Sequence, residues 1–134
     1  MQKGRETLTS SLKNQATKKS ILVIDDSTDM LELRKMILEM DGFTVFSAAS
    51  GTEALKMLNE VNVDLILLDF SLGDMNGPEF LKQLEMKQPK ILEDVPVVFL
   101  TGMDKSEVPR TKAAGLIPKS EGNEQFLKSV HSYL

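Results

Sequence analysis

The chain has 134 residues, enough to bury the core of one domain of ordinary size. It contains no cysteine, which excludes disulfide bonds and thiolate metal sites, so we expect oxygen ligands for any bound metal. No apolar run approaches the roughly 20 residues of a membrane span, and the N-terminus lacks the apolar core of a signal peptide. We therefore expect a cytoplasmic protein without a membrane partner.

The net charge of -4 is unevenly distributed along the chain. Residues 1–19 contain five basic side chains and one acidic one, whereas residues 20–134 contain 11 basic and 19 acidic side chains, a balance of -8. A body this acidic is not expected to bind nucleic acid. The first 19 residues are rich in Thr, Ser, Asn and Gln and are predicted to be a basic, disordered tail. Residues 20–134 are predicted to be the folded domain.

Five short apolar segments are predicted to form β-strands. Residues 20–25 and 64–69 are aliphatic runs that end in a carboxylate and lack the polar alternation of a half-exposed strand. We expect both strands to be buried on both faces. The remaining strands are predicted at residues 43–47, 95–100 and 116–118, the last being brief because Pro118 suits only a sheet edge.

Five helices are predicted between and after these strands. The first lies between an N-cap at Ser27 and a stop at Gly42. The others are expected at residues 50–60, 78–88, 107–114 and 122–134, with residues 89–94 as a linker. On the first helix, the apolar residues at helical spacing are Met30, Leu33, Ile37 and Met40.

Strands that alternate with helices through short loops predict a parallel sheet covered on both sides. We expect a doubly wound, flavodoxin-like α/β fold with five strands in the order 2-1-3-4-5. This order places the first and third strands side by side, so that Asp25 and Asp26 lie beside Asp69. There is no internal repeat, and the chain ends with the last helix, so we expect no output domain.

Three carboxylates at one end of a sheet repel one another unless a proton or a cation compensates their charge. Mg²⁺ prefers oxygen ligands and is commonly held by one or two carboxylates together with phosphate oxygens. Thr101, after the fourth strand, offers a hydroxyl group, and Lys119, after the fifth, offers an ammonium group. A carboxylate nucleophile, a cation and two donors are what in-line phosphoryl transfer to an aspartate requires.

From residue 20 onward, the sequence resembles the receiver domain of the two-component response-regulator family. Its size is that of a stand-alone member similar to the chemotaxis regulators. Five motifs carry the resemblance, in order, at the ends of five predicted elements. The matching residues are Asp25, Asp26, Asp69, Gly77, Thr101, Gly102 and Lys119.

The resemblance implies a role for each of these side chains. Asp69 would accept a phosphoryl group from the phosphohistidine of a sensor histidine kinase or a histidine phosphotransfer protein. Thr101 and Lys119 would contact that group, and the protein would signal to an unknown output protein. It would catalyse its own phosphorylation and dephosphorylation with Mg²⁺ rather than act as a conventional enzyme. The implied metal ligands are Asp25 through water, Asp26, Asp69 and the backbone carbonyl of Ser71.

The segment around the lysine departs from the family pattern. Pro118 precedes Lys119 and Ser120 follows it, whereas a proline usually follows the lysine in this family. Leu116 stands where the family often has a switch aromatic. We therefore expect that the usual switch, in which a threonine and an aromatic residue move together, does not operate in that form.

Two other functions compete with phosphoryl signalling. A pseudo-receiver would use the same fold as a protein-binding scaffold, with the acidic cluster as a structural or metal-binding feature. An aspartate-nucleophile phosphatase is less favoured, because the position two residues after the nucleophile is Ser71 rather than an acid. Taken alone, Thr101 would more often be a helix cap and Lys119 a solvated lysine. His131, on the last helix, is expected to be a surface residue.

Overall fold

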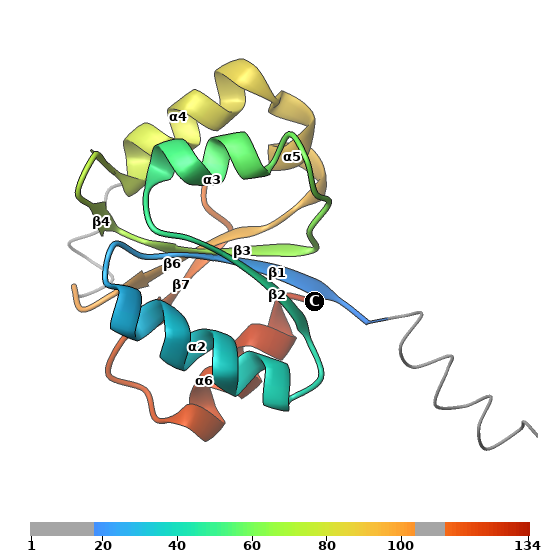
Figure 1. Cartoon of the computed structure of the whole chain (residues 1–134), viewed down its shortest axis with the longest axis vertical. Coiled ribbons are helices and arrows are strands. Elements are labelled where there is room, and N and C mark those ends of the chain that lie inside the picture. The colour runs from blue at the N-terminus through green and yellow to red at the C-terminus, as the bar shows by residue number, and fades with distance from the viewer. Residues whose placement is uncertain (1–17, 104–111) are drawn as a thin grey trace, which may run out of the picture.

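The computed structural model describes residues 18–103 and 112–134, which form three layers (Figure 1). The middle layer is a parallel sheet in the order β2-β1-β3-β6-β7, which confirms the predicted doubly wound, flavodoxin-like topology. Residues 1–17 of the predicted basic tail lie outside the described residues. The strands of the sheet are β1 (Ser20–Ile24), β2 (Thr44–Ala48), β3 (Leu65–Asp69), β6 (Val97–Thr101) and β7 (Gly115–Pro118).

Helices cover both faces of this sheet (Figure 1). This coverage of both faces is what the alternation of strands and helices predicted. In the described part of the chain, no helix has both the length and the apolar character needed to cross a membrane. The helices are α2 (Thr28–Met40) and α6 (Asn123–Ser132) on one face, and α3 (Gly51–Met57), α4 (Gly77–Lys87) and α5 (Pro89–Asp94) on the other.

Alternate residues of the central strands contribute to two separate cores. In β1, Ile21 and Val23 pack with residues of α2 and α6, whereas Leu22 and Ile24 pack with residues of α3 and α4. All five residues of β3 are buried, as the unbroken aliphatic run predicted. Because β3 is enclosed on both faces, the position of its last residue is firmly determined.

Two predicted boundaries on the α4 side are wrong. Residues 89–94 form α5 instead of a linker, because Pro89 is well suited to the first turn of a helix and the amide of Val95 closes the last turn onto the carbonyl of Ile91 at 2.7 Å. The following strand therefore begins at Val97 rather than at residue 95. The helix predicted at 50–60 ends earlier, at Met57, and continues as a turn.

The predicted helix at 107–114 falls mostly outside the described residues. Its last three residues, 112–114, are described and are not helical. The amide of Ala114 donates to the carbonyl of Val97 at 2.8 Å, so the chain is already extended along β6 before β7 begins. The brief last strand was predicted at 116–118, and β7 is one residue longer.

The buried face of α2 agrees only in part with the apolar spacing. Leu31, Arg34 and Leu38 are buried, whereas Leu33 and Met40 are exposed, Met40 by 81%. Ile37, from the same apolar set, is half-buried and packs against the core. The spacing missed the inward row because an arginine occupies one of its positions.

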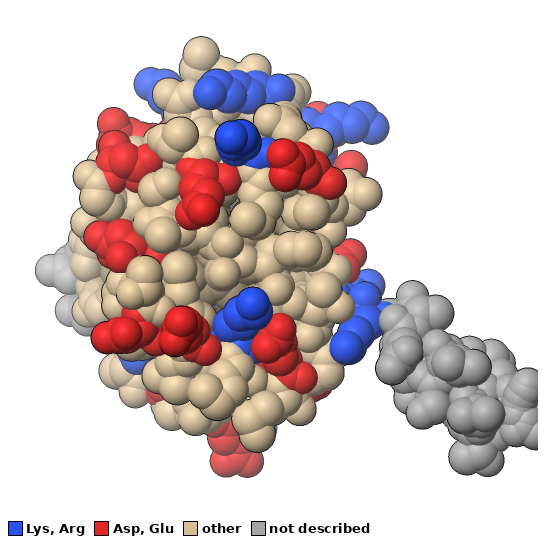
Figure 2. Space-filling model, in the orientation of Figure 1, with Lys and Arg blue, Asp and Glu red and all other residues tan. Residues whose placement is uncertain are grey.

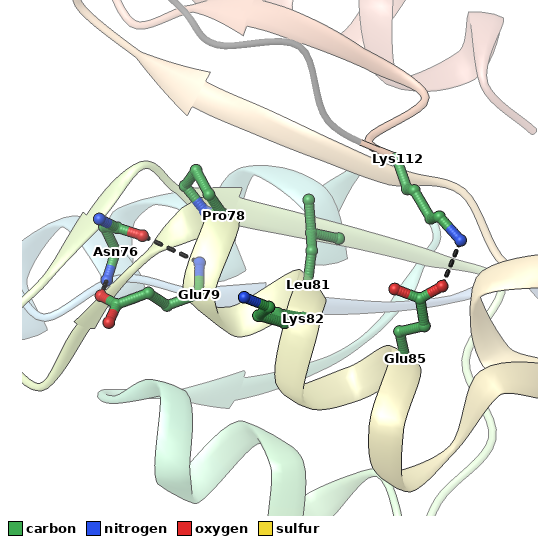
Figure 3. Close-up of a pocket in the computed structure, with 7 residues that line it drawn as sticks. All are labelled: Asn76, Pro78, Glu79, Leu81, Lys82, Glu85 and Lys112. Atoms are coloured by element: carbon green, nitrogen blue, oxygen red, sulfur yellow. Dashed lines mark hydrogen bonds and ion pairs between the residues drawn. The ribbon is translucent and has the colours of Figure 1, made fainter.

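Helix α4 is anchored at both ends (Figure 3). At its start, Asn76 Oδ1 accepts from the amide of Glu79 at 2.9 Å, and Glu79 Oε1 accepts from the amide of Asn76 at 3.0 Å, which is a capping box. Pro78 lies in the first turn, as predicted. Farther along the helix, Glu85 forms an ion pair with Lys112, so α4 also holds the chain just before β7.

Candidate functional site

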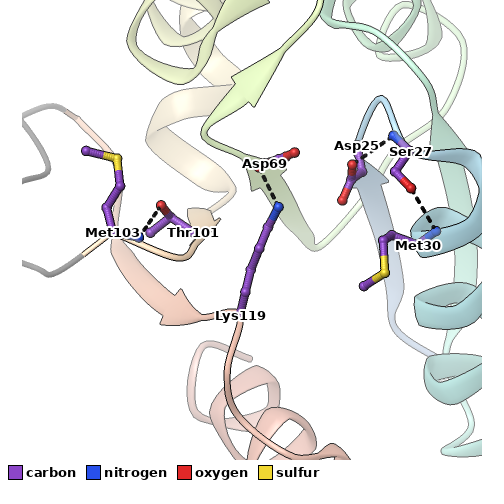
Figure 4. Close-up of polar contacts among 7 residues, drawn as sticks. All are labelled: Asp25, Ser27, Met30, Asp69, Thr101, Met103 and Lys119. Atoms are coloured by element: carbon purple, nitrogen blue, oxygen red, sulfur yellow. Dashed lines mark hydrogen bonds and ion pairs between the residues drawn. The ribbon is translucent and has the colours of Figure 1, made fainter.

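Three carboxylates meet at the carboxyl ends of two neighbouring strands, and Figure 4 shows two of them, Asp25 and Asp69. Asp25 directly follows β1 and Asp69 is the last residue of β3, and these strands pair so that Ile24 lies opposite Leu68. Carboxylate oxygens of Asp25, Asp26 and Asp69 all lie within 4.8 Å of one another. Asp25 and Asp69 are buried and Asp26 is exposed, so the group lies at the bottom of a site that is open on one side.

The surroundings of Asp25 suit a bound cation. Its Oδ1 accepts from the amide of Ser27 at 2.9 Å, but its buried Oδ2 has no hydrogen-bond partner. Burial raises the pKa of Asp25 above its ordinary value, and the nearby charge of Asp69 raises it further, against the lowering effects of the Ser27 hydrogen bond and Lys119. A buried acceptor that is short of both a partner and a positive charge fits a hard metal ion.

The cation that the structure does place at this group is Lys119 (Figure 4). Its Nζ lies 3.0 Å from Asp69 Oδ1, while its side chain remains one-third exposed. Its amide donates to the carbonyl of Thr101 at 2.9 Å, which extends the pairing of β6 and β7 by one residue. Lys119 is thus an ion-pair partner of the site rather than a solvated surface lysine.

Thr101 lies at the end of β6 and is buried, with 3% of its surface exposed. Its Oγ1 accepts from the amide of Met103 at 3.0 Å (Figure 4), so the side chain closes a tight turn. The hydroxyl oxygen is engaged as an acceptor, and its proton remains available for donation to a further group.

The chain that leaves Asp69 forms a small hairpin, where the sequence predicted only a turn-rich loop. Strand β4 (Ser71–Leu72) pairs antiparallel with β5 (Met75–Asn76). Ser71 lies on this hairpin, next to the strand end, where its backbone carbonyl was predicted to bind the metal. Gly73, at the turn, lies beside Asp26: a β-carbon added there would lie 3.8 Å from Asp26 Oδ2.

Asp74 holds the hairpin against α3, a role that its interpretation as a simple turn residue missed. Its carboxylate accepts from the amides of Gly51 and Thr52, both at 3.0 Å, and from the hydroxyl of Thr52 at 2.8 Å. Burial alone would raise the pKa of Asp74, but the hydrogen bonds from Thr52 and Gly51 outweigh it and hold the pKa below its ordinary value. Nothing in the local sequence indicates a contact 22 residues away.

On the face shown in Figure 2, acidic side chains lie along the side where the strands end, and basic side chains gather over α4. The strands that lead to Asp25 and Asp69 end on this acidic side, and such a charge distribution favours cations over anions there. His131 lies outside the acidic group: its Nε2 contacts Asp41 Oδ2 at 2.7 Å and its ring packs on Phe43. The side chain is more than half exposed, as predicted.

Residues 21–131 match the family model of the response regulator receiver domain. The chain belongs to this family. Receiver domains typically bind Mg²⁺ at an acidic pocket, and the described residues include such a group in Asp25, Asp26 and Asp69. Response regulators receive phosphoryl groups from histidine kinases or phosphotransfer proteins. The predicted family, the two-component signalling context and the fold class are therefore confirmed.

The chain is similar to a response regulator of nearly its own length and also to parts of longer regulatory proteins. The polar-differentiation response regulator DivK of Brucella ovis is 28% identical over 120 residues, which are 87% of this chain and 96% of that protein. The CpxR homologue of Haemophilus influenzae, a transcriptional regulatory protein, is 40% identical over 81 residues. That match includes 60% of this chain, but the chain spans only 33% of the length of that relative and 17% of that of GlrR from Escherichia coli.

Solved structures support the same assignment. The chemotaxis response regulator CheY4 of Vibrio cholerae superposes with a TM-score of 0.80 at 30% identity, covering 88% of this chain and all of that one. The response regulator TrrA of Thermotoga maritima, solved in complex with Mg²⁺ and BeF, gives a TM-score of 0.75 at 29% identity, covering 87% of this chain and 99% of that one. Solved response regulators, one of them in complex with Mg²⁺ and BeF, thus share the fold of this chain.

Proposed function

We propose that the chain is a phosphoacceptor that takes a phosphoryl group from a partner's phosphohistidine onto Asp69. The observation that carries this proposal is the joint position of three carboxylates within 4.8 Å and of Lys119 Nζ at 3.0 Å from Asp69 Oδ1, at the carboxyl ends of adjacent strands. This arrangement supplies a nucleophile and a compensating cation at the place where parallel sheets bind ligands.

In the proposed reaction, a carboxylate oxygen of Asp69 attacks the phosphorus atom of the phosphoimidazole. A P–O bond to Asp69 forms, the P–N bond breaks, and the imidazole leaves with its electron pair and takes up a proton. Lys119 pairs with the transferred group, and Thr101 donates its hydroxyl proton to it while accepting from Met103. Attack of water on the phosphorus atom later breaks the P–O bond and releases phosphate.

Mg²⁺ fits the oxygen ligands at this site, and we propose that Asp25, Asp26, Asp69 and the carbonyl of Ser71 hold it, Asp25 through water. Bound there, it would supply charge neutralisation for the phosphoryl oxygens. The unpartnered Oδ2 of Asp25 supports this assignment, because a buried acceptor without a donor is costly unless a cation or water satisfies it.

Incubation with acetyl phosphate and Mg²⁺, followed by phosphate-affinity gel electrophoresis, tests the proposal. We expect the wild-type protein to gain a hydrolytically labile acyl phosphate, and Asp69→Asn to gain none. Asp64→Asn is the matched control, because Asp64 lies at the other end of β3, bonded to the amide of Ser20, and should label like the wild type. Equal labelling of wild type and Asp69→Asn would refute the proposal.

Mg²⁺ titration separates signalling from the scaffold alternative. A phosphoacceptor should bind Mg²⁺ in the millimolar range with loss of binding in Asp26→Asn. If neither labelling nor Mg²⁺ binding is found, a pseudo-receiver scaffold is the better description of this chain.

A further inference from the structure

Arg34 is a charged side chain at a position where the pattern of α2 calls for an apolar one. It lies three residues after Leu31 and four before Leu38, and all three residues face inward. Only 7% of Arg34 is exposed. Arginine is almost never buried to this extent unless its charge is compensated, so the surroundings of the guanidinium group require an explanation.

The described contacts leave that group only partly satisfied. Its Cζ lies 5.7 Å from the centroid of the Phe126 ring on α6, which is a cation–π contact. Its Nε has no hydrogen-bond partner. Only one other buried side-chain atom in the described residues shares this condition, and it is Oδ2 of Asp25, an atom of opposite charge in the acidic group.

Arg34 also shares a cavity with the lysine of the site. A pocket of about 150 Å³ between α2, the end of β7 and the start of α6 is lined by both Arg34 and Lys119, with Leu100 and Pro118 among its walls. Two cations therefore line one pocket, in which Glu121 is a third charged group. Lys119 pairs directly with Asp69, whereas no carboxylate of the described residues lies in hydrogen-bond contact with Arg34.

The charge of Arg34 is nevertheless linked to the acidic group. Burial lowers the pKa of the guanidinium, and the charges of Asp25 and then Asp69 oppose that effect. A guanidinium group keeps its proton in proteins, so this charge is permanent. Because Arg34 is itself buried, its charge acts over longer distances than it would at the surface.

We propose that Arg34 is a resident counter-cation of the acidic group, which opposes Mg²⁺ binding and favours the phosphoryl group. Arg34 lies within the protein on α2, held over Phe126, and supplies positive charge that the three carboxylates would otherwise take from a metal ion. When a phosphoryl group adds negative charge at Asp69, the same guanidinium stabilises it. The role is that of a positioning charge, since Arg34 bonds to none of the reacting atoms.

The part of this inference that concerns the phosphoryl group rests on the proposed function. The inference predicts that loss of the Arg34 charge changes the affinities for Mg²⁺ and for beryllofluoride in opposite directions. Replacing Arg34 with Met keeps the length and apolar stem of the side chain and removes the charge. Mg²⁺ should then bind about three- to tenfold more tightly, because an electrostatic competitor is gone. Beryllofluoride, measured at saturating Mg²⁺, should bind about threefold more weakly, because its negative charge has lost a favourable partner.

Isothermal titration calorimetry of the full chain with MgCl₂ and then with beryllofluoride, at low ionic strength, measures both affinities. Arg34→Lys retains the charge and should stay close to the wild type for both ligands. Lys35→Met removes the same charge from the adjacent residue of α2, which is only half-buried, and should change each affinity less than twofold, roughly the limit expected for a solvent-screened charge. Circular dichroism and urea unfolding of each variant verify the fold.

If Arg34 had only a structural role, Arg34→Met would bind both Mg²⁺ and beryllofluoride more weakly, since loosening α2 disorders the whole site. Parallel weakening, or an unchanged Mg²⁺ affinity in a folded Arg34→Met variant, would overturn the inference. If Arg34→Met does not fold, the comparison of Arg34→Lys with Arg34→Gln serves the same purpose. A wild-type protein that binds no Mg²⁺ would count against the proposed function itself, which separates that failure from a failure of the role of Arg34.

Discussion

The acidic group is flanked by two regions that are held in different ways. On the α3 and α4 side, the segment from Phe70 to Gly77 is held by backbone and capping hydrogen bonds. The amide of Gly77 donates to the carbonyl of Phe70 at 2.6 Å, and Asp74 accepts from the first residues of α3. On the α2 and β7 side lie the charged groups of Lys119, which pairs with Asp69, and of Arg34, which lines a pocket together with Lys119.

One flank of the acidic group is therefore held by hydrogen-bond geometry, and the other interacts with it through charge. Hydrogen bonds within the hairpin do not depend on the net charge of the three carboxylates, whereas the ion interactions on the other flank do. Binding of a cation or transfer of a phosphoryl group changes that net charge. We therefore expect substitutions in the hairpin flank to change mainly stability, and substitutions in the charged flank to change mainly ligand binding.

The largest expected effect on the hairpin flank is that of Gly77→Ala. A β-carbon at residue 77 would overlap the ring of Phe99, which is fully buried and cannot move aside cheaply. Overpacking of this kind costs about 1–3 kcal/mol of unfolding free energy. Urea unfolding followed by circular dichroism measures the loss.

Gly102→Ala is the matched control for that substitution. It makes the same chemical change close to the site, but none of the described residues lies within 4 Å of the added carbon. Its stability should stay within about 0.5 kcal/mol of the wild type. Equal losses for the two variants would show that the contact between Gly77 and Phe99 does not determine the stability of this flank.

A smaller and opposite change in stability is expected for Asp25→Asn in metal-free protein. The pKa of Asp25 is raised by burial and then by the charge of Asp69, so the folded state holds this proton more tightly than the unfolded state does. Ionised Asp25 therefore costs stability, and its neutral amide should raise the unfolding free energy by roughly 1 kcal/mol. Mg²⁺ binding should weaken in the same variant.

The pH dependence gives the sign of this effect. Well below the ordinary pKa of 3.8, the carboxyl group is neutral in both states, and the wild type and Asp25→Asn should be equally stable. The advantage of the variant should grow as pH rises from there through the raised pKa of the folded state, and then level off. Unfolding in the presence of EDTA measures it, with Asp29→Asn, exposed in the first turn of α2, as the control. An advantage that shrinks with rising pH would contradict the assignment.

The position of the site at the strand ends could be predicted because it depends on a small number of strong local patterns. Unbroken aliphatic runs before Asp25 and Asp69 determine two buried strands, and the doubly wound order then places their ends side by side. Thr101 and Lys119 follow from the same rule. The ion pair between Lys119 and Asp69 adds the one contact that the topology alone does not specify.

The rest of the site depends on contacts that local patterns do not encode. Arg34 was missed because a search for apolar spacing ignores an arginine, although its place between Leu31 and Leu38 was a usable signal. The role of Asp74 was missed because it depends on α3, which is distant in sequence. Helix α5 was missed because one proline was interpreted as a linker rather than as a helix start.

The smallest expected effect tests whether Asp74 matters to the hairpin flank. Asp74→Ala removes three hydrogen bonds to the start of α3, but the side chain is exposed and Ser50 still caps the helix. The loss of unfolding free energy should therefore be only about 0.5 kcal/mol, at the low end for a capping residue. Asp94→Ala, which removes the same charge from the exposed end of α5, should cost less.

The pH dependence of this loss runs opposite to that of Asp25. Because the pKa of Asp74 is held below its ordinary value of 3.8, the folded state favours the ionised form, and the stabilisation is fully present above 3.8. It is lost as pH falls from there through the lower pKa of the folded state. Wild type and Asp74→Ala should therefore converge in stability in acid, whereas a difference that persists at low pH would mean that Asp74 acts through packing. Mg²⁺ affinity should change little in Asp74→Ala, since the bonds that it loses lie on the flank held by geometry.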